Sequence, residues 1–462
     1  MTPPAGAEPA GRAEVLRRDD QRYVWHPFTP MSEWCAEPPL VIAAGDGNHL
    51  VDVDGNRYLD AVSSLWANVH GHRHPRLDAA LAEQAGRIAH STMLGLANVP
   101  ATELARRLVA IAPERLVKVF YAGDGASAVE IALKMAFQYQ ALTGREGRDL
   151  FLRLGEAYHG DTIGSVSVGG IGIFHRIFGP LLFDTVEAPS PYCYRCPLGL
   201  ARPECAMACA DELERLAAQN ADRIAAVIVE PLVQAAAGMI TAPDGYLRRV
   251  RETCDRHGLL MIVDEVATGF GRTGRMFACT AEGVQPDLMT VGKGITGGYL
   301  PLSAVLTTQE VFDAFLGRPE EHRTFFHGHT YTGNPLAAAV AVANLDVFEE
   351  ERTVERLAPR IELLAALLRQ RVAPLRHVGD VRQKGLMVGI ELVRDRDTKE
   401  PFDGGLRVGD RVQRLARGHG VIMRPLGDVV VLMPPLSITQ DELDRLVAVT
   451  ARCIDEATEA VR

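Results

Sequence analysis

Short apolar segments alternate with helical patterns through the middle of the chain. Five of these segments run without polar alternation: LVKVFYAG (116–123), AAVIVEPLV (225–233), LLMIVDEVA (259–267), DLMTVG (287–292) and SAVLTT (303–308). Strands that are apolar on both faces belong to a mostly parallel sheet that helices cover on both sides. The central part of the sequence therefore predicts an α/β fold.

The two ends of the chain have a different character. Between residues 40 and 66, the pairs Asp46-Gly47 and Asp54-Gly55 interrupt short alternating segments, which indicates an antiparallel meander. After about residue 345 the pattern changes to long charged helices and short strands. Both ends therefore favour a smaller α+β unit beside the central one.

These patterns predict a division of the chain into domains. We expect a large domain with a mostly parallel sheet over residues 70–344, and a smaller domain formed by residues 21–69 and 345–462. Residues 1–20 are rich in Pro, Ala and Gly and lack the apolar core of a signal peptide. We expect them to be a disordered leader that runs into a short helix.

Composition and charge narrow the class of ligand. The 462 residues carry a formal charge of -10, so no basic field is available to hold nucleic acid or an anionic membrane. No apolar run reaches the length of a transmembrane helix. We therefore expect a cytoplasmic protein with reduced thiols that acts on small molecules.

Three strand ends carry unusual groups. One apolar strand ends in Asp264, another ends in Lys293, and a third runs into the glycine-rich turn Gly123–Gly125 before a helix. Taken singly, the aspartate could be a helix cap, the lysine could be exposed, and glycine is a usual turn residue. In an open parallel sheet, however, ligands bind beyond the carboxyl ends of the strands, so we expect these groups to face one site.

A carboxylate, a lysine and a helix N-terminus at one sheet edge are the groups that pyridoxal phosphate requires. The lysine can form a Schiff base with the aldehyde. A buried aspartate can keep the pyridinium nitrogen protonated, and the first N–H groups of a helix can hold the phosphate. We therefore predict a pyridoxal-phosphate site that contains Lys293 and Asp264.

Two neighbouring stretches carry a family resemblance. IVDEVATGFGRTG, followed by PDLMTVGKGITGG with Lys293 29 positions after Asp264, resembles the signature of the class III pyridoxal-phosphate aminotransferases. This resemblance extends over nearly the whole chain. It implies the transferase fold type I, with a small domain built from both termini. It also implies a homodimer whose active sites are shared between the subunits.

Within that class, several stretches most resemble the diaminopelargonic acid synthases of biotin biosynthesis: WHPF (25–28), SSLWANVHGHRHP (63–75), YHGDTIGSVSV (158–168), HGHTYTGNPLAA (327–338) and RPLGD (424–428). The resemblance implies transfer of an amino group to 8-amino-7-oxononanoate. It also implies a set of site residues. Cofactor contacts would come from Gly125, Ala126, Tyr158, His159, Asp264, Lys293, His329 and Thr330, with Thr330 reaching the phosphate from the partner subunit. Substrate contacts would come from Phe28, Leu65, Trp66, Tyr158, Lys293, Gly328 and Arg424.

Three positions depart from the pattern of the adenosylmethionine-using enzymes. Leu65 stands where a second tryptophan is expected, Phe28 stands in a tyrosine position, and the phosphate turn ends Gly-Ala rather than Gly-Ser. These changes resemble the branch that takes its amino group from lysine. Adenosylmethionine is the expected donor and lysine its rival. Two further functions stay open: a 4-aminobutyrate type of ω-aminotransferase, and a catalytically silent binding protein on the same scaffold.

Four cysteines form a separate cluster. Cys193, Cys196, Cys205 and Cys209 lie within 17 residues with the spacing CxxC-x8-CxxxC, which could hold zinc or an iron–sulfur cluster. The cluster could equally be a variable insertion with reduced thiols. Any metal here would be structural, because the chemistry is already assigned to the lysine.

Overall fold

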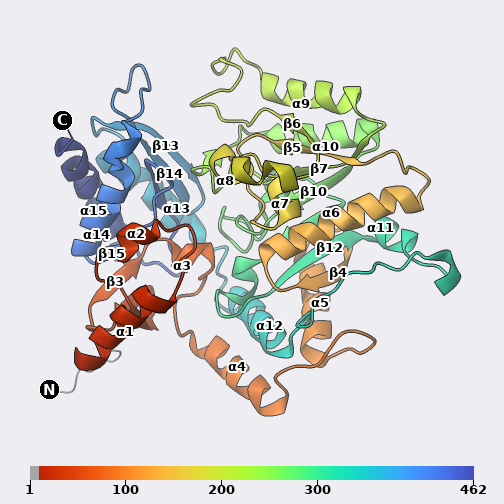
Figure 1. Cartoon of the computed structure of the whole chain (residues 1–462), viewed down its shortest axis with the longest axis horizontal. Coiled ribbons are helices and arrows are strands. Elements are labelled where there is room, and N and C mark those ends of the chain that lie inside the picture. The colour runs from red at the N-terminus through yellow and green to blue at the C-terminus, as the bar shows by residue number, and fades with distance from the viewer. Residues whose placement is uncertain (1–9, 462) are drawn as a thin grey trace.

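A seven-stranded sheet forms the core of the larger part of the molecule, on the right in Figure 1. The computed structural model describes residues 10–461. In spatial order the strands are β4 (Leu116–Ala122), β12 (Ser303–Thr308), β11 (Leu288–Val291), β10 (Leu260–Asp264), β7 (Ile224–Val229), β5 (Leu150–Leu154) and β6 (Thr185–Ala188). Only β12 runs against its neighbours, so the prediction of a mostly parallel sheet is confirmed.

The central strands are buried on both faces. Along β10, Met261 and Val263 pack into one hydrophobic core, whereas Ile262 between them packs into the other. Helix α6 (Gly125–Leu142) covers the second face, and α10 (Tyr246–His257) lies on the first. Because successive side chains of a strand point to opposite faces, an unbroken apolar run is what a doubly covered strand needs.

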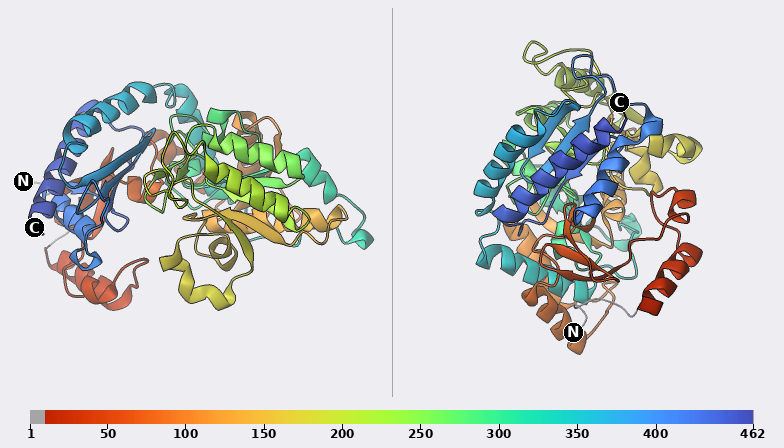
Figure 2. Two further views of the ribbon diagram at one scale, coloured as in Figure 1. Left: turned by 90° about the horizontal axis from the view of Figure 1, so that it is seen from above. Right: turned by 90° about the vertical axis from the view of Figure 1, so that its left-hand side faces the viewer.

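Residues from the two ends of the chain build two smaller sheets. One has four strands, β1 (Ile42–Asp46), β2 (His49–Asp52), β3 (Arg57–Asp60) and β15 (Val421–Ile422), and the other contains β13 (Val378–Lys384), β14 (Met387–Leu392) and β16 (Val429–Leu432). Strands β1, β2 and β3 form the predicted antiparallel meander, and β15 joins β3 in parallel. In Figure 2, elements from the first part of the chain (red) and from the last part (blue) belong to the same region of the molecule, as the pairing of β3 with β15 requires. The domain boundaries given above stay a prediction.

The remaining elements surround these sheets. The other helices are α1 (Ala10–Tyr23), α2 (Met31–Trp34), α3 (Ser63–Trp66), α4 (Pro75–Arg87), α5 (Val99–Ile111), α7 (Ile163–Ser167), α8 (Gly172–His175), α9 (Ala208–Gln219), α11 (Gln309–Ala314), α12 (Pro335–Glu350), α13 (Leu357–Leu367), α14 (Val408–Gly418) and α15 (Gln440–Glu459). A short hairpin pairs β8 (Val233–Gln234) with β9 (Ile240–Thr241). Among the described residues, no helix is long and apolar enough to cross a membrane.

The disordered leader expected over residues 1–20 extends too far, because helix α1, the short helix expected after it, already begins at Ala10. The helix is held in place because Ala13 is buried and Arg17 pairs with Asp54, which lies between β2 and β3. Asp20 accepts a hydrogen bond from Nε1 of Trp34 at 2.8 Å. Residues 1–9 of the predicted leader lie outside the described residues.

Candidate active site

One cavity opens at the carboxyl ends of β4, β7, β10 and β11. Asp264 and Lys293 line it together with the first residues of α6 and with Tyr158 and His159. The structure thus brings together the residues that were predicted from the strand ends. Neighbouring parallel strands end at the same edge of a sheet, and this register gathers residues that are far apart in sequence.

Lys293 follows β11 directly and has a left-handed backbone with φ of 43°. Its Nζ lies 5.2 Å from the centre of the Trp66 ring. Burial lowers the pKa of the Lys293 amine, while the carboxylates of Asp264 and Glu230 act in the opposite direction. A lowered pKa increases the share of neutral amine, which is the form that can attack a carbonyl or accept a proton.

Asp264 is buried and fixed by three donors. Nδ1 of His159 lies 2.7 Å from Oδ2, and Oδ1 accepts from the backbone N–H of Val266 at 3.0 Å and from Oγ1 of Thr290 at 2.9 Å. A carboxylate has about four lone-pair positions, so one remains for a further donor from the cavity. The next residue, Glu265, is buried elsewhere and accepts hydrogen bonds from Thr268 and Cys279.

Glu230, which was not among the predicted site residues, is a second buried carboxylate in the cavity. Its two oxygens accept the backbone N–H groups of Tyr158 and Ala235 at 3.0 and 2.9 Å. Burial raises the pKa of Glu230 to about 7. Glu230 follows β7 as Asp264 ends β10, so the same rule about strand ends could have found it.

The start of helix α6 forms the far wall of the cavity. Asp124 caps the helix, and its side chain accepts from the N–H of Ser127 at 2.8 Å. Gly125 has no room for a side chain, because a Cβ there would lie 2.6 Å from Cγ1 of Val266. The N–H groups of Gly125 and Ala126 at this helix start are suited to an anion.

A second cavity adjoins the first, since Trp66, Tyr158 and Lys293 line both. Its other lining residues include Phe28, Leu65, Glu156, Ile171, Ile173, Phe174 and Arg424. In the described part of the chain, the Arg424 guanidinium has neither a hydrogen bond nor an ion pair. The cavity therefore offers mainly apolar walls and an available cation.

An unusual backbone turn carries two of these wall residues. Ser63, Ser64, Leu65 and Trp66 all have positive φ, a conformation that costs about 1–2 kcal/mol per residue for L-amino acids. Arg272, which the sequence did not reveal, is buried and donates to the carbonyl of Trp66 at 3.2 Å. Asp60 accepts from the N–H of Ser64 at 2.9 Å. These bonds hold the strained turn against the cavity.

Gly328, His329 and Thr330 do not line either cavity within one chain. All three are exposed in the segment between α11 and α12. The N–H of His329 donates to Oγ1 of Thr332 at 3.0 Å. Their expected contact with the cofactor of the partner subunit stays a prediction.

The first cavity fits pyridoxal phosphate. It combines a lysine of lowered pKa, a fixed aspartate with a spare acceptor position and a glycine-started helix. Nε2 of His159 is buried without a partner, which is consistent with a site that is completed by a bound group. Lys293 would hold the aldehyde, Asp264 the ring nitrogen, and the N–H groups of Gly125 and Ala126 the phosphate.

Comparison with known proteins agrees with this geometry. The family model described as Aminotransferase class-III matches residues 31–454. The adenosylmethionine-8-amino-7-oxononanoate aminotransferase of Nitratidesulfovibrio vulgaris is 58% identical over 99% of this chain and 84% of its own length. The crystal structure of the protein of that name from Methanocaldococcus jannaschii has a TM-score of 0.92 and 46% identity, covering 96% of this chain and 99% of that chain.

An (S)-enantioselective omega-transaminase from Thermomicrobium roseum has a TM-score of 0.91 and 38% identity, covering 96% of this chain and 99% of that chain. The shared backbone confirms the expected pyridoxal-phosphate transferase fold type I. Enzymes of this class depend on pyridoxal phosphate. The chain belongs to the class-III aminotransferases.

Proposed function

We propose that this enzyme transfers an amino group from S-adenosylmethionine to 8-amino-7-oxononanoate, giving 7,8-diaminononanoate for biotin biosynthesis. The names of the relatives with 46–58% identity support this assignment. The observation that carries it is the unpaired Arg424 in a mainly apolar cavity beside Lys293. Such a cavity suits a long-chain oxo acid with one terminal carboxylate. A cytoplasmic location stays a prediction.

Lys293 is the proposed catalytic base. Bound pyridoxal phosphate withdraws electrons from the carbon that bears the amino group, which makes a proton on that carbon removable. The neutral Nζ of Lys293 would accept this proton from the substrate carbon. It would then return the proton to the carbon of the cofactor. Since burial lowers the pKa of this amine, a larger share of Nζ is neutral and able to act as a base.

Asp264 keeps the cofactor ring in its electron-withdrawing state. A carboxylate that faces the ring nitrogen favours the protonated nitrogen, because the two carry opposite charges at short range. His159 Nδ1 donates to Oδ2 of Asp264 at 2.7 Å and fixes the orientation of the carboxylate. Tyr158, whose backbone N–H donates to Glu230 at 3.0 Å, would cover the ring.

The substrate cavity explains how a long chain would be aligned. Arg424 binds the terminal carboxylate through two N–H donors, and the methylene chain lies against Phe28, Leu65 and Trp66. The ring of Phe28 lies 5.3 Å from the ring of Phe174, so this wall is aromatic on one side. The oxo group then points toward Lys293.

Lysine is the second candidate donor, and two wall residues favour it. The side chain of Leu65 is 53% exposed in the cavity, where a tryptophan would offer a stacking surface for adenine. Phe28 cannot donate a hydrogen bond, unlike tyrosine. The two changes remove one aromatic surface and one hydroxyl that could contact an adenine.

The donor can be identified with the cofactor-loaded enzyme in the absence of an oxo acid. We expect S-adenosylmethionine to convert the bound cofactor into its amino form in a single turnover, seen by absorbance. Subsequent addition of 8-amino-7-oxononanoate should restore the starting spectrum and release diaminononanoate. Conversion by lysine alone would replace the donor assignment and leave the acceptor intact. Conversion by 4-aminobutyrate alone would contradict both.

Substitution of Arg424→Gln tests the carboxylate contact. Loss of a charge-assisted pair of about 2 kcal/mol should raise the KM for the oxo acid by about 30-fold. The methyl ester of the oxo acid should be a poor substrate for both proteins, and Arg424→Gln should hardly change its KM. Arg411→Gln is the matched control, because Arg411 is exposed and donates to the carbonyl of Leu406. Equal effects on acid and ester would contradict the contact.

We also propose that a second copy of the chain completes each site. Several large apolar side chains are strongly exposed in the segments next to Thr330 and near the start of α5: Leu94, Leu96, Val99, Phe326 and Tyr331. The two segments lie side by side, because Asn98 donates to the carbonyl of Gly333 at 2.9 Å. An apolar surface of this kind favours burial against another protein surface, and Thr330 would then face the phosphate of the partner subunit.

Mixed dimers test this arrangement. Thr330→Glu should abolish cofactor binding through repulsion of the phosphate, and Lys293→Ala should abolish activity. Heterodimers of these two variants should regain one intact site, because Lys293 comes from one subunit and Thr330 from the other. Activity that does not return in isolated heterodimers would contradict the shared site. Thr324→Glu, an exposed position in the same segment, should leave cofactor binding unchanged.

A further inference from the structure

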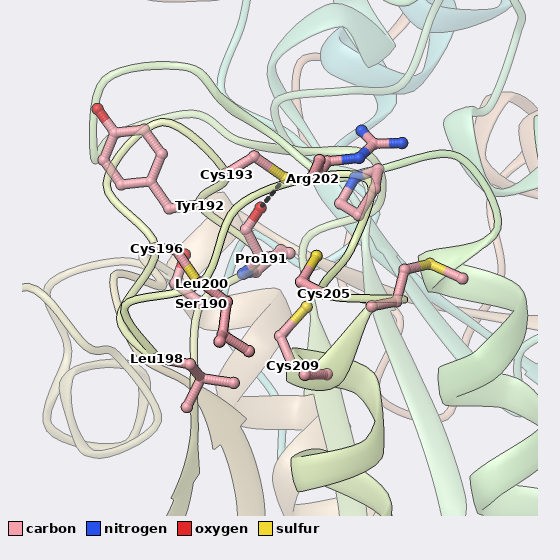
Figure 3. Close-up of a pocket in the computed structure, with 13 residues that line it drawn as sticks. Ser190, Pro191, Tyr192, Cys193, Cys196, Leu198, Leu200, Arg202, Cys205 and Cys209 are labelled. Carbon is pink, nitrogen blue, oxygen red and sulfur yellow. Dashed lines mark hydrogen bonds between the residues drawn. The ribbon is translucent and has the colours of Figure 1, made fainter.

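The four cysteines of the sequence motif line a cavity of their own. Cys193, Cys196 and Cys205 lie on the connection between β6 and α9, and Cys209 lies in the first turn of α9 (Figure 3). No residue is shared between this cavity and the two cavities of the active site. The amino-transfer chemistry therefore leaves these thiols without a role.

The size of the cavity limits what it can hold. The space that a water-sized particle can occupy in it is about 20 Å³, close to what one such particle needs. The walls between the thiols are largely apolar and include Pro191, Leu198 and Leu200. A water molecule needs two to four polar partners and would find few here. A single ion with sulfur ligands is of this size.

The thiols contribute little to the fold as they stand. All four are free cysteines, and the hydrogen bond drawn in Figure 3 is a long one, from Sγ of Cys193 to the carbonyl of Pro191 at 3.8 Å. The connection from Ser190 to Met207 has neither helix nor strand. A chain segment of this length without regular structure gains order from a cross-link or a bound ion.

We propose that Cys193, Cys196, Cys205 and Cys209 bind one Zn²⁺ ion as four thiolates. Each thiol releases its proton on binding, and the ion gains a tetrahedral set of four sulfur ligands at about 2.3 Å. Among residues 10–461, no three His, Cys, Asp or Glu side chains already stand at ligand spacing. Binding therefore turns the cysteine side chains to other rotamers around the cavity and draws the connection inward.

The ion would stabilise a link between this connection and the active site. Tyr192 and Arg195, beside Cys193 and Cys196, both donate to the buried carboxylate of Glu391. Arg382 donates to Glu391 at 2.6 Å and to the carbonyl of Gly238 at 2.8 Å. Gly238 follows Ala236 and Ala237, which line the substrate cavity. The proposed site is thus structural and supports one wall of the pocket.

Metal analysis of the cofactor-loaded enzyme tests the proposal. Protein purified under reducing conditions should contain about one zinc per chain. The zinc content of Cys193→Ser and of Cys205→Ser should fall below about a tenth of an ion per chain. Both variants should still contain bound pyridoxal phosphate. Cys35→Ser should keep its zinc, because Cys35 is an exposed thiol in a different part of the chain.

Cobalt provides a second measurement on the unmodified chain, which covers the case in which a variant does not fold. Protein stripped with a chelator should take up about one Co²⁺ per chain and show the intense visible absorption of tetrahedral sulfur coordination. Zinc should displace this spectrum. The proposal would be overturned if the wild-type protein contained no metal and gave no cobalt spectrum. Its four thiols would then react freely with a thiol reagent or be joined in disulfides.

Discussion

The amine of Lys293 shares its surroundings with two buried carboxylates, and this electrostatic arrangement depends on the parallel sheet. Strands β11, β10 and β7 are neighbours, so Lys293, Asp264 and Glu230 emerge at the same edge. Burial lowers the pKa of the Lys293 amine, whereas the carboxylates of Asp264 and Glu230 raise it. The opposing effects of burial and of the two carboxylates leave a buried amine that can still exchange protons. Amino-group transfer requires such an amine.

The site also depends on the residues from the two ends of the chain. The left-handed turn at Ser63–Trp66 brings an aromatic wall against Lys293, and Arg424 supplies the available cation from a segment near the C-terminus. Arg272 links these parts, since it donates to the carbonyl of Trp66 and to that of Pro434 at 2.8 Å. The strain of the turn is compensated by such bonds, and the pocket therefore forms only in the folded whole.

Much of this arrangement could be predicted from the sequence, and the exceptions have physical reasons. Unbroken apolar runs identified five of the seven strands, and the ends of two of these runs identified Asp264 and Lys293. Glu230 obeys the same rule and could have been found. Arg272 could not, because it acts on backbone carbonyls of distant segments that no sequence pattern connects. The role of Thr330 depends on a second chain, so neither one sequence nor one folded copy fixes its contact.

The attachment point of the cofactor is the sharpest check on the role of Lys293. The enzyme loaded with pyridoxal phosphate would be treated with borohydride, which fixes the bond between cofactor and lysine, and then digested for mass spectrometry. We expect a single labelled peptide that contains residues 286–301, with the added mass on Lys293. A label on any other lysine, or a fully loaded enzyme that carries no label, would contradict this assignment.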